Sequence, residues 1–475
     1  MAPRQPNVIM VVVDDLGWRD LGCTGSDFYE TPHIDALAAR GVRFSQAYAA
    51  APNCSPTRAS LLTGRAPARV GMTHQAGGHN VGRLCDVPSF RELPRQEFTL
   101  ARALRSHGYQ TWHVGKWHLG GRRSWPDRHG FEVNVGGCDL GHPPSHVSPY
   151  GIPTLDDGPE GEYLTDRLTD EAIGLIDRRD AERPFFLNLW HYAVHTPLQA
   201  PAELVEHFAE KARRLGRDPE TDIEVGEPAP GWNTTDRRLI RRRRQGDPVY
   251  AAMIHVLDAA IGRLLDAVAR AVLTEDTVVV FTSDNGGLHS GFAAATSNLP
   301  LAEGKGWLEE GGLRVPLVID APGQVRGGRV DETPVCSPDL YPTLLGLAGL
   351  PARPEQHVDG VDLTDHLRGK DPGATEDRPL FWHFPHYPEV GGTPASAVRL
   401  GRHKLIRSYE HERDVLHDLG ADPGETEDLA GTWPHAAEAL GWLLDEWLAD
   451  VDARVPQPNP YPGGFEEYAR GTVDA

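Results

Sequence analysis

Several polar residues stand directly after apolar runs, and their side chains are of types that bind metals and anions. They are Asp14 with Asp15, Lys116 with His118, His191 with His195, and Asp284 with Asn285. The carboxylates and the amide offer only hard oxygen ligands, which favours Ca²⁺ or Mg²⁺ over zinc or copper. A single acidic pair would more simply form a turn or a helix cap. Three carboxylates packed together without a cation would be unfavourable, so the group as a whole indicates a metal site.

Cys54 stands at the start of a segment that is predicted to be helical, with Pro56 in its first turn and Gly64 beyond its end. A reactive side chain there would face the positive end of the helix dipole, which stabilises anions and lowers the pKa of a thiol. The simpler interpretation of a lone cysteine is a small buried hydrophobic residue. Together, a cation site, an anion-attracting nucleophile and cationic side chains indicate hydrolysis of an anionic ester, either sulfate or phosphate.

The elements that must position these residues alternate between strands and helices. Short apolar, β-branched runs predict buried strands at residues 8–13, 111–114, 185–190, 277–282 and 315–319. Residues 249–272 carry an apolar stripe at helical spacing. This alternation predicts an α/β fold with a large, mostly parallel central sheet flanked by helices. Ligands bind beyond the carboxyl ends of such strands, which is where the polar residues stand.

Two regions depart from the alternating pattern. Residues 209–247 are rich in charge and are interpreted as a surface insertion, in which the run 241–244 of four arginines is expected to be solvated. From residue 371 to residue 475, short alternating runs precede an amphipathic helix near 436–448. This pattern predicts a small C-terminal α+β domain with an antiparallel sheet, following a catalytic α/β domain of residues 1–370.

Composition limits the classes of partner. The 475 residues carry a formal charge of −21, which argues against general binding to nucleic acid or to an anionic membrane. An anionic substrate must therefore meet a local cluster of positive charge. The five cysteines show no metal-ligand spacing, and their odd number speaks against a disulfide framework. No signal peptide is visible, so a cytoplasmic protein is expected.

Residues 54–65, Cys-Ser-Pro-Thr-Arg-Ala-Ser-Leu-Leu-Thr-Gly-Arg, resemble the signature of the formylglycine-dependent (type I) sulfatases, whose core is Cys-x-Pro-x-Arg. Further segments resemble the same family in the family's order: 7–15, 115–120, 195–197, 283–287 and 304–316. Segments 404–406 and 418–429 resemble its small C-terminal domain. The resemblance implies an alkaline-phosphatase-like fold and sulfate ester hydrolysis.

The resemblance also implies a cofactor and a modification. A formylglycine-generating enzyme would oxidise Cys54 to the aldehyde formylglycine (3-oxoalanine), which hydrates to a geminal diol. The metal, usually Ca²⁺ with Mg²⁺ as the other candidate, would be bound by the modified Cys54 together with Asp14, Asp15, Asp284 and Asn285. One diol hydroxyl attacks sulfur, and the second allows the sulfate to be released by elimination.

The family's catalytic roles carry over to this sequence position by position. Lys116 and Lys305 would hold the sulfate oxygens, and Arg58 would orient the diol. His195 would protonate the departing alcohol, and His118 would remove a proton from the second hydroxyl. His195 precedes a Thr-Pro pair as in the family, although Val194 replaces a common proline. His191 is therefore interpreted as a structural residue.

The alcohol part of the substrate is less constrained by the sequence. Five residues lie in loops or near motifs where the family builds its substrate pocket, although each is individually more typical of ordinary packing: His74, His142, His289, Trp307 and His383. The layout most resembles family members that act on sulfated sugars, and aryl sulfates should also react because they need little acid assistance.

Two alternatives remain open at this point. A phosphonate or phosphate ester hydrolase could use the same scaffold, because tetrahedral anions differ little in shape. A non-catalytic binding protein is disfavoured, because a pure binder has no use for a modifiable Cys54 beside Arg58, Lys116 and His118.

Overall fold

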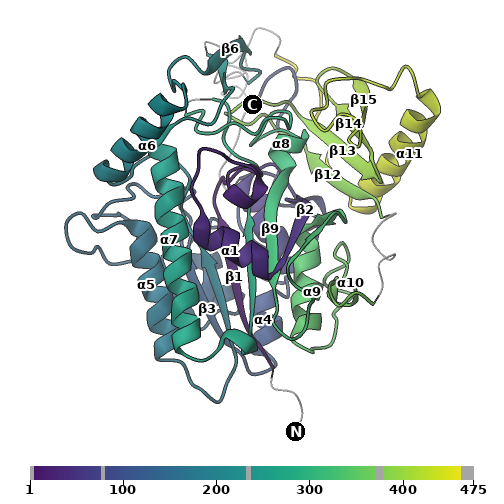
Figure 1. Cartoon of the computed structure of the whole chain (residues 1–475). Helices are drawn as coiled ribbons and strands as arrows, with labels where there is room; N and C mark the ends of the chain where they lie inside the picture. Colours follow the sequence, from purple (N-terminus) through teal and green to yellow (C-terminus); the bar gives the residue numbers. More distant parts are fainter. Residues whose placement is uncertain (1–4, 76–80, 232–236, 292, 371–377, 462–475) are drawn as a thin grey trace, which may run out of the picture.

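The seven residues of β1 (Asn7–Val13) are all buried, six of them are apolar, and the strand lies in the middle of a nine-stranded sheet (Figure 1). The computed structural model describes residues 5–75, 81–231, 237–291, 293–370 and 378–461. The strand order is β10-β2-β9-β8-β1-β5-β3-β4, with β11 paired to β2. The other strands are β2 (Val42–Tyr48), β3 (Gln110–Gly115), β4 (Val133–Val135), β5 (Phe185–Trp190), β8 (Thr277–Ser283), β9 (Arg314–Asp320), β10 (Arg329–Asp331) and β11 (Val335–Cys336).

Pairing in this sheet is mostly parallel, which confirms the predicted fold class. β1 pairs in parallel with both β5 and β8, and β3 pairs in parallel with β4 and β5. β9 is the exception, because it runs antiparallel to both β2 and β8. The carboxyl ends of β1, β3, β5 and β8 therefore meet at one edge of the sheet, where the predicted site residues follow them.

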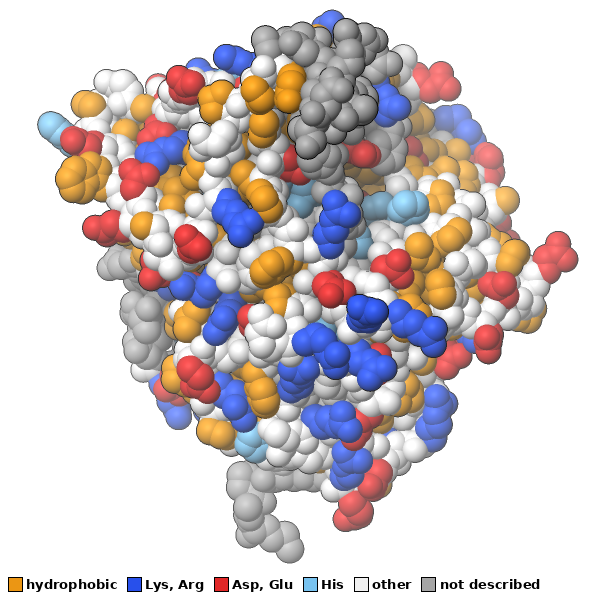
Figure 2. All heavy atoms as spheres, turned by 180° about the vertical axis from the view of Figure 1, so that it is seen from behind, with side chains coloured by type: hydrophobic (Ala, Val, Ile, Leu, Met, Phe, Trp, Pro, Cys, Tyr) orange, Lys and Arg blue, Asp and Glu red, His pale blue; other side chains and the backbone are white. Residues whose placement is uncertain are grey.

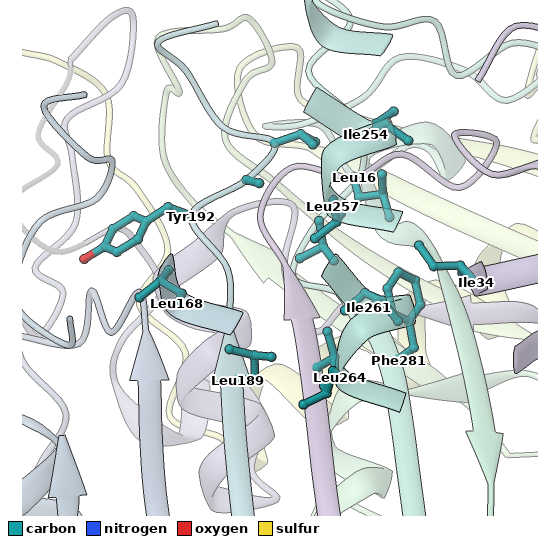
Figure 3. Packing of buried hydrophobic residues seen from close by; sticks show 14 of the residues in the cluster. Leu16, Ile34, Leu168, Leu189, Tyr192, Ile254, Leu257, Ile261, Leu264 and Phe281 are labelled. Atoms are coloured by element: carbon teal, nitrogen blue, oxygen red, sulfur yellow. The ribbon is translucent and has the colours of Figure 1, made fainter. Parts of the chain in front are cut away.

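Helices cover both faces of the sheet. α1 (Pro32–Arg40), α5 (Leu164–Asp177) and α7 (Pro248–Arg270) form the front layer of Figure 1, whereas α4 (Leu100–Arg105) lies behind the sheet. A hydrophobic core lies between each layer of helices and the sheet. Alternate residues of β1 belong to one core and then the other, because successive side chains of a strand point to opposite faces. Figure 3 shows Ile254, Leu257, Ile261 and Leu264 of α7 packed toward the sheet. The predicted apolar stripe of this helix is thus its buried face.

The remaining helices are short or peripheral: α2 (Cys54–Thr63), α3 (Pro67–Val70), α6 (Ala202–Arg214), α8 (Glu310–Leu313), α9 (Leu340–Leu347) and α10 (Thr364–Leu367). Among the described residues, no helix is both long and apolar enough to span a lipid bilayer.

A second, antiparallel sheet stands beside the first (Figure 1). Its strands, in order, are β12 (Leu380–Phe384), β13 (Ala395–Leu400), β14 (His403–Ser408) and β15 (Arg413–Asp418). One face of this sheet packs on α11 (Pro434–Asp450), which overlaps the helix predicted near 436–448. The domain boundary predicted at residue 371 lies outside the described residues.

The predicted charged insertion contains the end of α6 and a two-stranded sheet of β6 (Ile223–Pro228) and β7 (Arg238–Arg242). The expectation of a solvated arginine run is wrong for Arg241 and Arg242, which are both buried. Arg241 forms ion pairs with Glu227 and with Glu303, at 2.8 and 2.9 Å. These carboxylates come from β6 and from the loop before α8. Because they are not neighbours of Arg241 in the sequence, the local run of arginines could not indicate these ion pairs.

A buried ionic cluster joins the two sheets. Lys404 of β14 contacts Glu310 of α8 at 3.0 Å and Glu425 at 2.8 Å, and all three side chains are at most 1 % exposed. Tyr48 of β2 donates to Glu310 at 2.7 Å, and the Glu310 amide donates to Glu425 at 2.6 Å. Burial raises the pKa of Glu425 to about 8, although Lys404 opposes the shift.

Replacing Lys404 by Met should destabilise the fold by about 3 kcal/mol near pH 8, because Glu425 would be left buried without its cation, while Glu310 would keep its longer ion pair with Arg314 at 3.8 Å. Without Lys404 the folded-state pKa of Glu425 would lie still further above its unfolded value, so the loss should shrink as the pH falls and this carboxyl takes up a proton. Urea unfolding of both proteins at pH 8 and pH 5 measures the difference. Arg413→Met, on the exposed end of β15, is the matched control and should cost little. An equal loss at both pH values would contradict this account.

Candidate active site

Cys54 is the first residue of α2, and its side chain is buried at one end of the charged site. Asn53 is the N-cap residue, and its side-chain oxygen accepts a hydrogen bond from the Cys54 amide at 2.9 Å. The Cys54 Sγ lies 3.2 Å from Nδ1 of His118. The predicted lowering of the thiol pKa is wrong. Burial raises the pKa of Cys54, and the opposing effects of Lys116 and Lys305 do not cancel that of burial.

Three buried carboxylates meet within this site, as predicted. Asp14 and Asp15 follow β1, and Asp284 follows β8, the strand paired to β1. The Asp15 amide donates to Asp284 at 3.2 Å, and the Asn285 side-chain NH₂ donates to Asp15 at 2.8 Å. Parallel pairing of the two strands thus places all four predicted oxygen donors together.

Three cationic side chains offset this charge. Arg58, one turn along α2 from Cys54, contacts Asp284 at 2.7 Å and packs over the ring of Trp190. Lys116 donates to Asp14 at 2.6 Å. Lys305 donates to Asp15 at 2.8 Å. Burial alone would raise the pKa of Asp15, but Lys305 and then His195 hold it well below its usual range.

The donor set fits a hard divalent cation. Oδ1 of Asp14 and Oδ1 of Asn285 are buried, and neither accepts a hydrogen bond from any described residue. Burial raises the pKa of Asp14 well above its usual value despite its contact with Lys116, because Asp284 and Asp15 add negative charge. Oxygen atoms of Asp14 and Asp15 also lie within 4.8 Å of a ring nitrogen of His195. Unsatisfied buried oxygens beside crowded carboxylates are what an oxygen-ligated metal would satisfy.

Two histidines contact different members of the site. His118 follows β3 and contacts Cys54, and its backbone carbonyl accepts a hydrogen bond from Ser55 at 2.8 Å. His195 lies beyond β5, with Nε2 3.1 Å from Nζ of Lys305 and Nδ1 2.9 Å from the carbonyl of Thr196. Burial, followed by nearby lysines, lowers the pKa of both imidazoles well below the usual value.

His191 and His142 differ in their relation to this site. The ring of His191 is fully buried, and neither of its nitrogens bonds to any described residue, so no hydrogen bond joins it to the site. Its burial lowers the pKa of His191 to about 3. His142, which is exposed, stacks on His195 with ring centroids 5.8 Å apart and planes 8° from parallel. His142 therefore stands at the solvent side of the site.

His289 and Trp307 lie beside the segment that carries Lys305. His289 contacts Glu303 at 2.8 Å, and a Cβ on Gly304 would come within 2.4 Å of the His289 ring. Trp307 packs under the guanidinium of Arg241, 5.4 Å from its ring centroid. His289 therefore packs against the loop 303–307, Trp307 is the last residue of that loop, and the same loop carries Lys305 into the site.

His74 and His383 are more remote. His74 packs on His386, with ring centroids 4.4 Å apart, and the adjacent Gln75 accepts a hydrogen bond from Asn53 at 3.1 Å. His383 lies in β12, where its ring nitrogens contact Ser396 and the carbonyl of Arg454. His74 is therefore linked to the N-cap of α2, whereas the hydrogen bonds of His383 stay within the C-terminal part of the chain.

Asn53 is a site residue that the sequence analysis missed. Its oxygen caps α2 and lies 3.5 Å from Sγ of Cys54. The signal was present, because Asn is among the preferred N-cap residues and directly precedes the predicted helix. Glu303 was missed for a different reason, since its partners Arg241 and His289 are distant in sequence.

Comparison with known proteins identifies the class to which this fold and site belong. The Sulfatase family model matches residues 6–350, and the model of the N-sulphoglucosamine sulphohydrolase C-terminal region matches residues 304–448. The chain belongs to the sulfatase family, with an alkaline-phosphatase-like fold, and it is a sulfuric ester hydrolase.

Individual relatives extend over most of the chain. N-acetylgalactosamine-6-sulfatase of Canis lupus familiaris is 33 % identical over 92 % of this chain and 78 % of that protein. Human arylsulfatase A is 33 % identical over 95 % of this chain and 89 % of that protein. The crystal structure of Ps i-CgsB in complex with k-i-k-neocarrahexaose is 28 % identical, with a TM-score of 0.74, and covers 99 % of this chain and 96 % of that one.

Proposed function

We propose that this protein hydrolyses the sulfate ester of a sulfated sugar, using formylglycine at residue 54 and a bound divalent metal. The observation that carries the proposal is the single buried cluster in which Cys54 and His118 are in contact beside Asp14, Asp15, Asp284 and Asn285. The sugar specificity is supported by relatives named for a sulfated sugar and by a related structure that holds a neocarrahexaose. Aryl sulfates should also be substrates. A phosphonate or phosphate ester hydrolase is not favoured, because these relatives are sulfatases.

The metal would be held by Asp14, Asp15, Asp284, Asn285 and the modified residue 54, with calcium as the first candidate. When bound, it would withdraw electron density from the sulfate oxygens and balance their charge. Arg58 is fully buried between Asp284 and Asp14, so it fixes these carboxylates from the side of α2. Lys116 and Lys305 each present an ammonium group to the cluster and would bind the remaining sulfate oxygens.

Formylglycine would supply a hydrated aldehyde, of which one hydroxyl attacks sulfur and the other provides the proton whose removal releases sulfate. A formylglycine-generating enzyme is the partner that this maturation requires. His118 suits the removal of that proton, because it already contacts residue 54 and its low pKa keeps the ring neutral. His195 suits the leaving-group side, where Lys305 contacts Nε2. The charge of a bound sulfate would offset that of Lys305 and so favour protonated His195.

Active protein should carry an aldehyde in place of the Cys54 thiol. Peptide mass spectrometry should find the peptide containing residue 54 without its sulfur and reactive toward a hydrazide. Specific activity on 4-nitrophenyl sulfate should rise in proportion to the modified fraction across preparations. Cys54→Ala should be inactive, whereas Cys85→Ala, a half-buried cysteine outside the site, should retain full activity. Full activity with an entirely unmodified Cys54 would exclude this mechanism.

Removal of the metal should abolish turnover and lower stability. Dialysis against a chelator should inactivate the enzyme, and calcium at about one hundred times its Kd should restore activity and raise the free energy of unfolding by about 2.7 kcal/mol. Asp284→Asn should lose this calcium-dependent stabilisation, because it removes one buried carboxylate. Glu438→Gln, the same change of charge at an exposed position of α11, should keep it. Stabilisation of Asp284→Asn equal to that of the wild type would place the cation elsewhere.

His195→Ala should affect substrates according to their leaving groups. An alkyl or sugar sulfate releases a poor leaving group and should lose roughly 10²–10⁴-fold in kcat, whereas 4-nitrophenyl sulfate should lose far less. His191→Gln, measured at equal folded fraction, should show no such difference, because that ring makes no hydrogen bond to the site. If both substrates lose equally with His195→Ala, proton donation belongs to another residue, with Lys305 the next to test.

A further inference from the structure

Residues 91–128 carry positive charge against the trend of the whole chain. They include seven arginines and Lys116 but only three carboxylates, whereas the chain has a formal charge of −21. Arg102 is half-buried, and the other six arginines are exposed: Arg91, Arg95, Arg105, Arg122, Arg123 and Arg128. We call the surface formed by these six side chains the arginine face.

The arginine face is formed by three segments, which are residues 91–95, the end of α4 at Arg105, and residues 122–128. Hydrogen bonds join these segments. The Arg102 guanidinium donates to the carbonyls of Arg95 at 2.7 Å and Arg128 at 2.6 Å. The Leu93 amide donates to Leu119, and the Ser124 hydroxyl donates to Leu93, so residues 91–95 lie against residues 119–124. The exposed arginines of these segments therefore belong to one continuous surface.

Most of this charge has no acidic partner. Arg105 lies 3.6 Å from Glu132, and Arg128 lies 3.1 Å from Asp127. Within the described part of the chain, no carboxylate forms an ion pair with Arg91, Arg95, Arg122 or Arg123. α4 lies behind the sheet in Figure 1, and Figure 2, which views the molecule from that side, shows Lys and Arg side chains gathered in the lower middle. Burial and then the neighbouring Arg95 lower the pKa of Arg102, as expected among like charges.

The arginine face begins close to the catalytic cluster. Arg122 follows His118 by four residues, so their Cα atoms are at most about 14 Å apart. His118 in turn contacts Cys54 at 3.2 Å. A small sulfate ester held at Cys54 could not extend over exposed arginines on three chain segments. A polymer with a sulfate group in the site could do so.

We propose that the arginine face docks the anionic chain of a sulfated polysaccharide while one of its sulfate esters occupies the site at Cys54. This inference rests on the proposed function, because it identifies the substrate as part of a polymer rather than a free sugar. Charge complementarity is the physical basis, since an array of unpaired guanidinium groups releases counterions from a polyanion that it binds. The expected consequence is a selective gain for polymeric substrates at low salt.

Binding of dextran sulfate, with uncharged dextran as the blank, tests the proposal directly. The double variants Arg122→Ser/Arg123→Ser and Arg91→Ser/Arg95→Ser should each raise the Kd for dextran sulfate by about tenfold at low salt, with a shallower dependence of log Kd on log salt. Both should retain the wild-type kcat/KM for 4-nitrophenyl sulfate, which is too small to reach the arginine face. Using two separate pairs guards against a local folding defect in either one.

Arg213→Ser/Arg214→Ser is the matched control, because it removes the same charge from exposed positions of α6. It should bind dextran sulfate as the wild type does. An equal loss in this control, no loss in the arginine-face variants, or tighter wild-type binding to duplex DNA of similar charge would overturn the proposal. Cys54→Ala should still bind dextran sulfate, so a failure of the proposed catalytic function would be seen separately, as absent turnover of 4-nitrophenyl sulfate by the wild type.

Discussion

The structure depends on keeping a group of buried like charges together. Asp14, Asp15 and Asp284 are at most 1 % exposed, and burial of a carboxylate is costly without a partner of opposite charge. Arg58 and Lys116 supply that charge from α2 and from the end of β3, and Lys305 supplies it from the loop before α8. The strand order β8-β1-β5-β3 brings the three carboxylates and Lys116 together, because each of them follows the carboxyl end of a strand on the same edge. Loss of any one of them would leave an uncompensated buried ion.

The edge of the sheet at the carboxyl ends of β8, β1, β5 and β3 was predicted well from the sequence, for an identifiable physical reason. A strand that is covered on both faces must be apolar throughout, so β1, β5 and β8 are visible as continuous runs, and the polar residues that end them are equally visible. Because ligands bind where such strands end, the four oxygen donors could be grouped before their contacts were known. The helix of Cys54 was visible from its proline and glycine, and Gly64 has the left-handed φ of 67° expected at such an end.

The rest depends on pairings between distant residues, which local patterns do not record. The apolar run of β9 gave no sign that it lies antiparallel to its neighbours, because burial on both faces looks the same in either direction. Arg241 is buried because Glu227 and Glu303 reach it from elsewhere, and a run of arginines is indistinguishable in sequence from a solvated one. The raised pKa of the Cys54 thiol has the same origin, since a helix N-terminus favours the thiolate but complete burial outweighs it.

Net charge has a similar limitation, because it omits position. A total of −21 indicates repulsion of any anion, yet interactions between exposed charges are largely screened beyond about 8 Å at physiological ionic strength. An anionic chain near the arginine face therefore responds mainly to the local guanidinium groups, and distant carboxylates contribute little. The buried Lys116 and Lys305 are screened far less, but under the proposed function they would reach only the one sulfate that enters the site. An acidic protein can thus hold one sulfate strongly through buried cations and the rest of a polymer weakly through exposed ones.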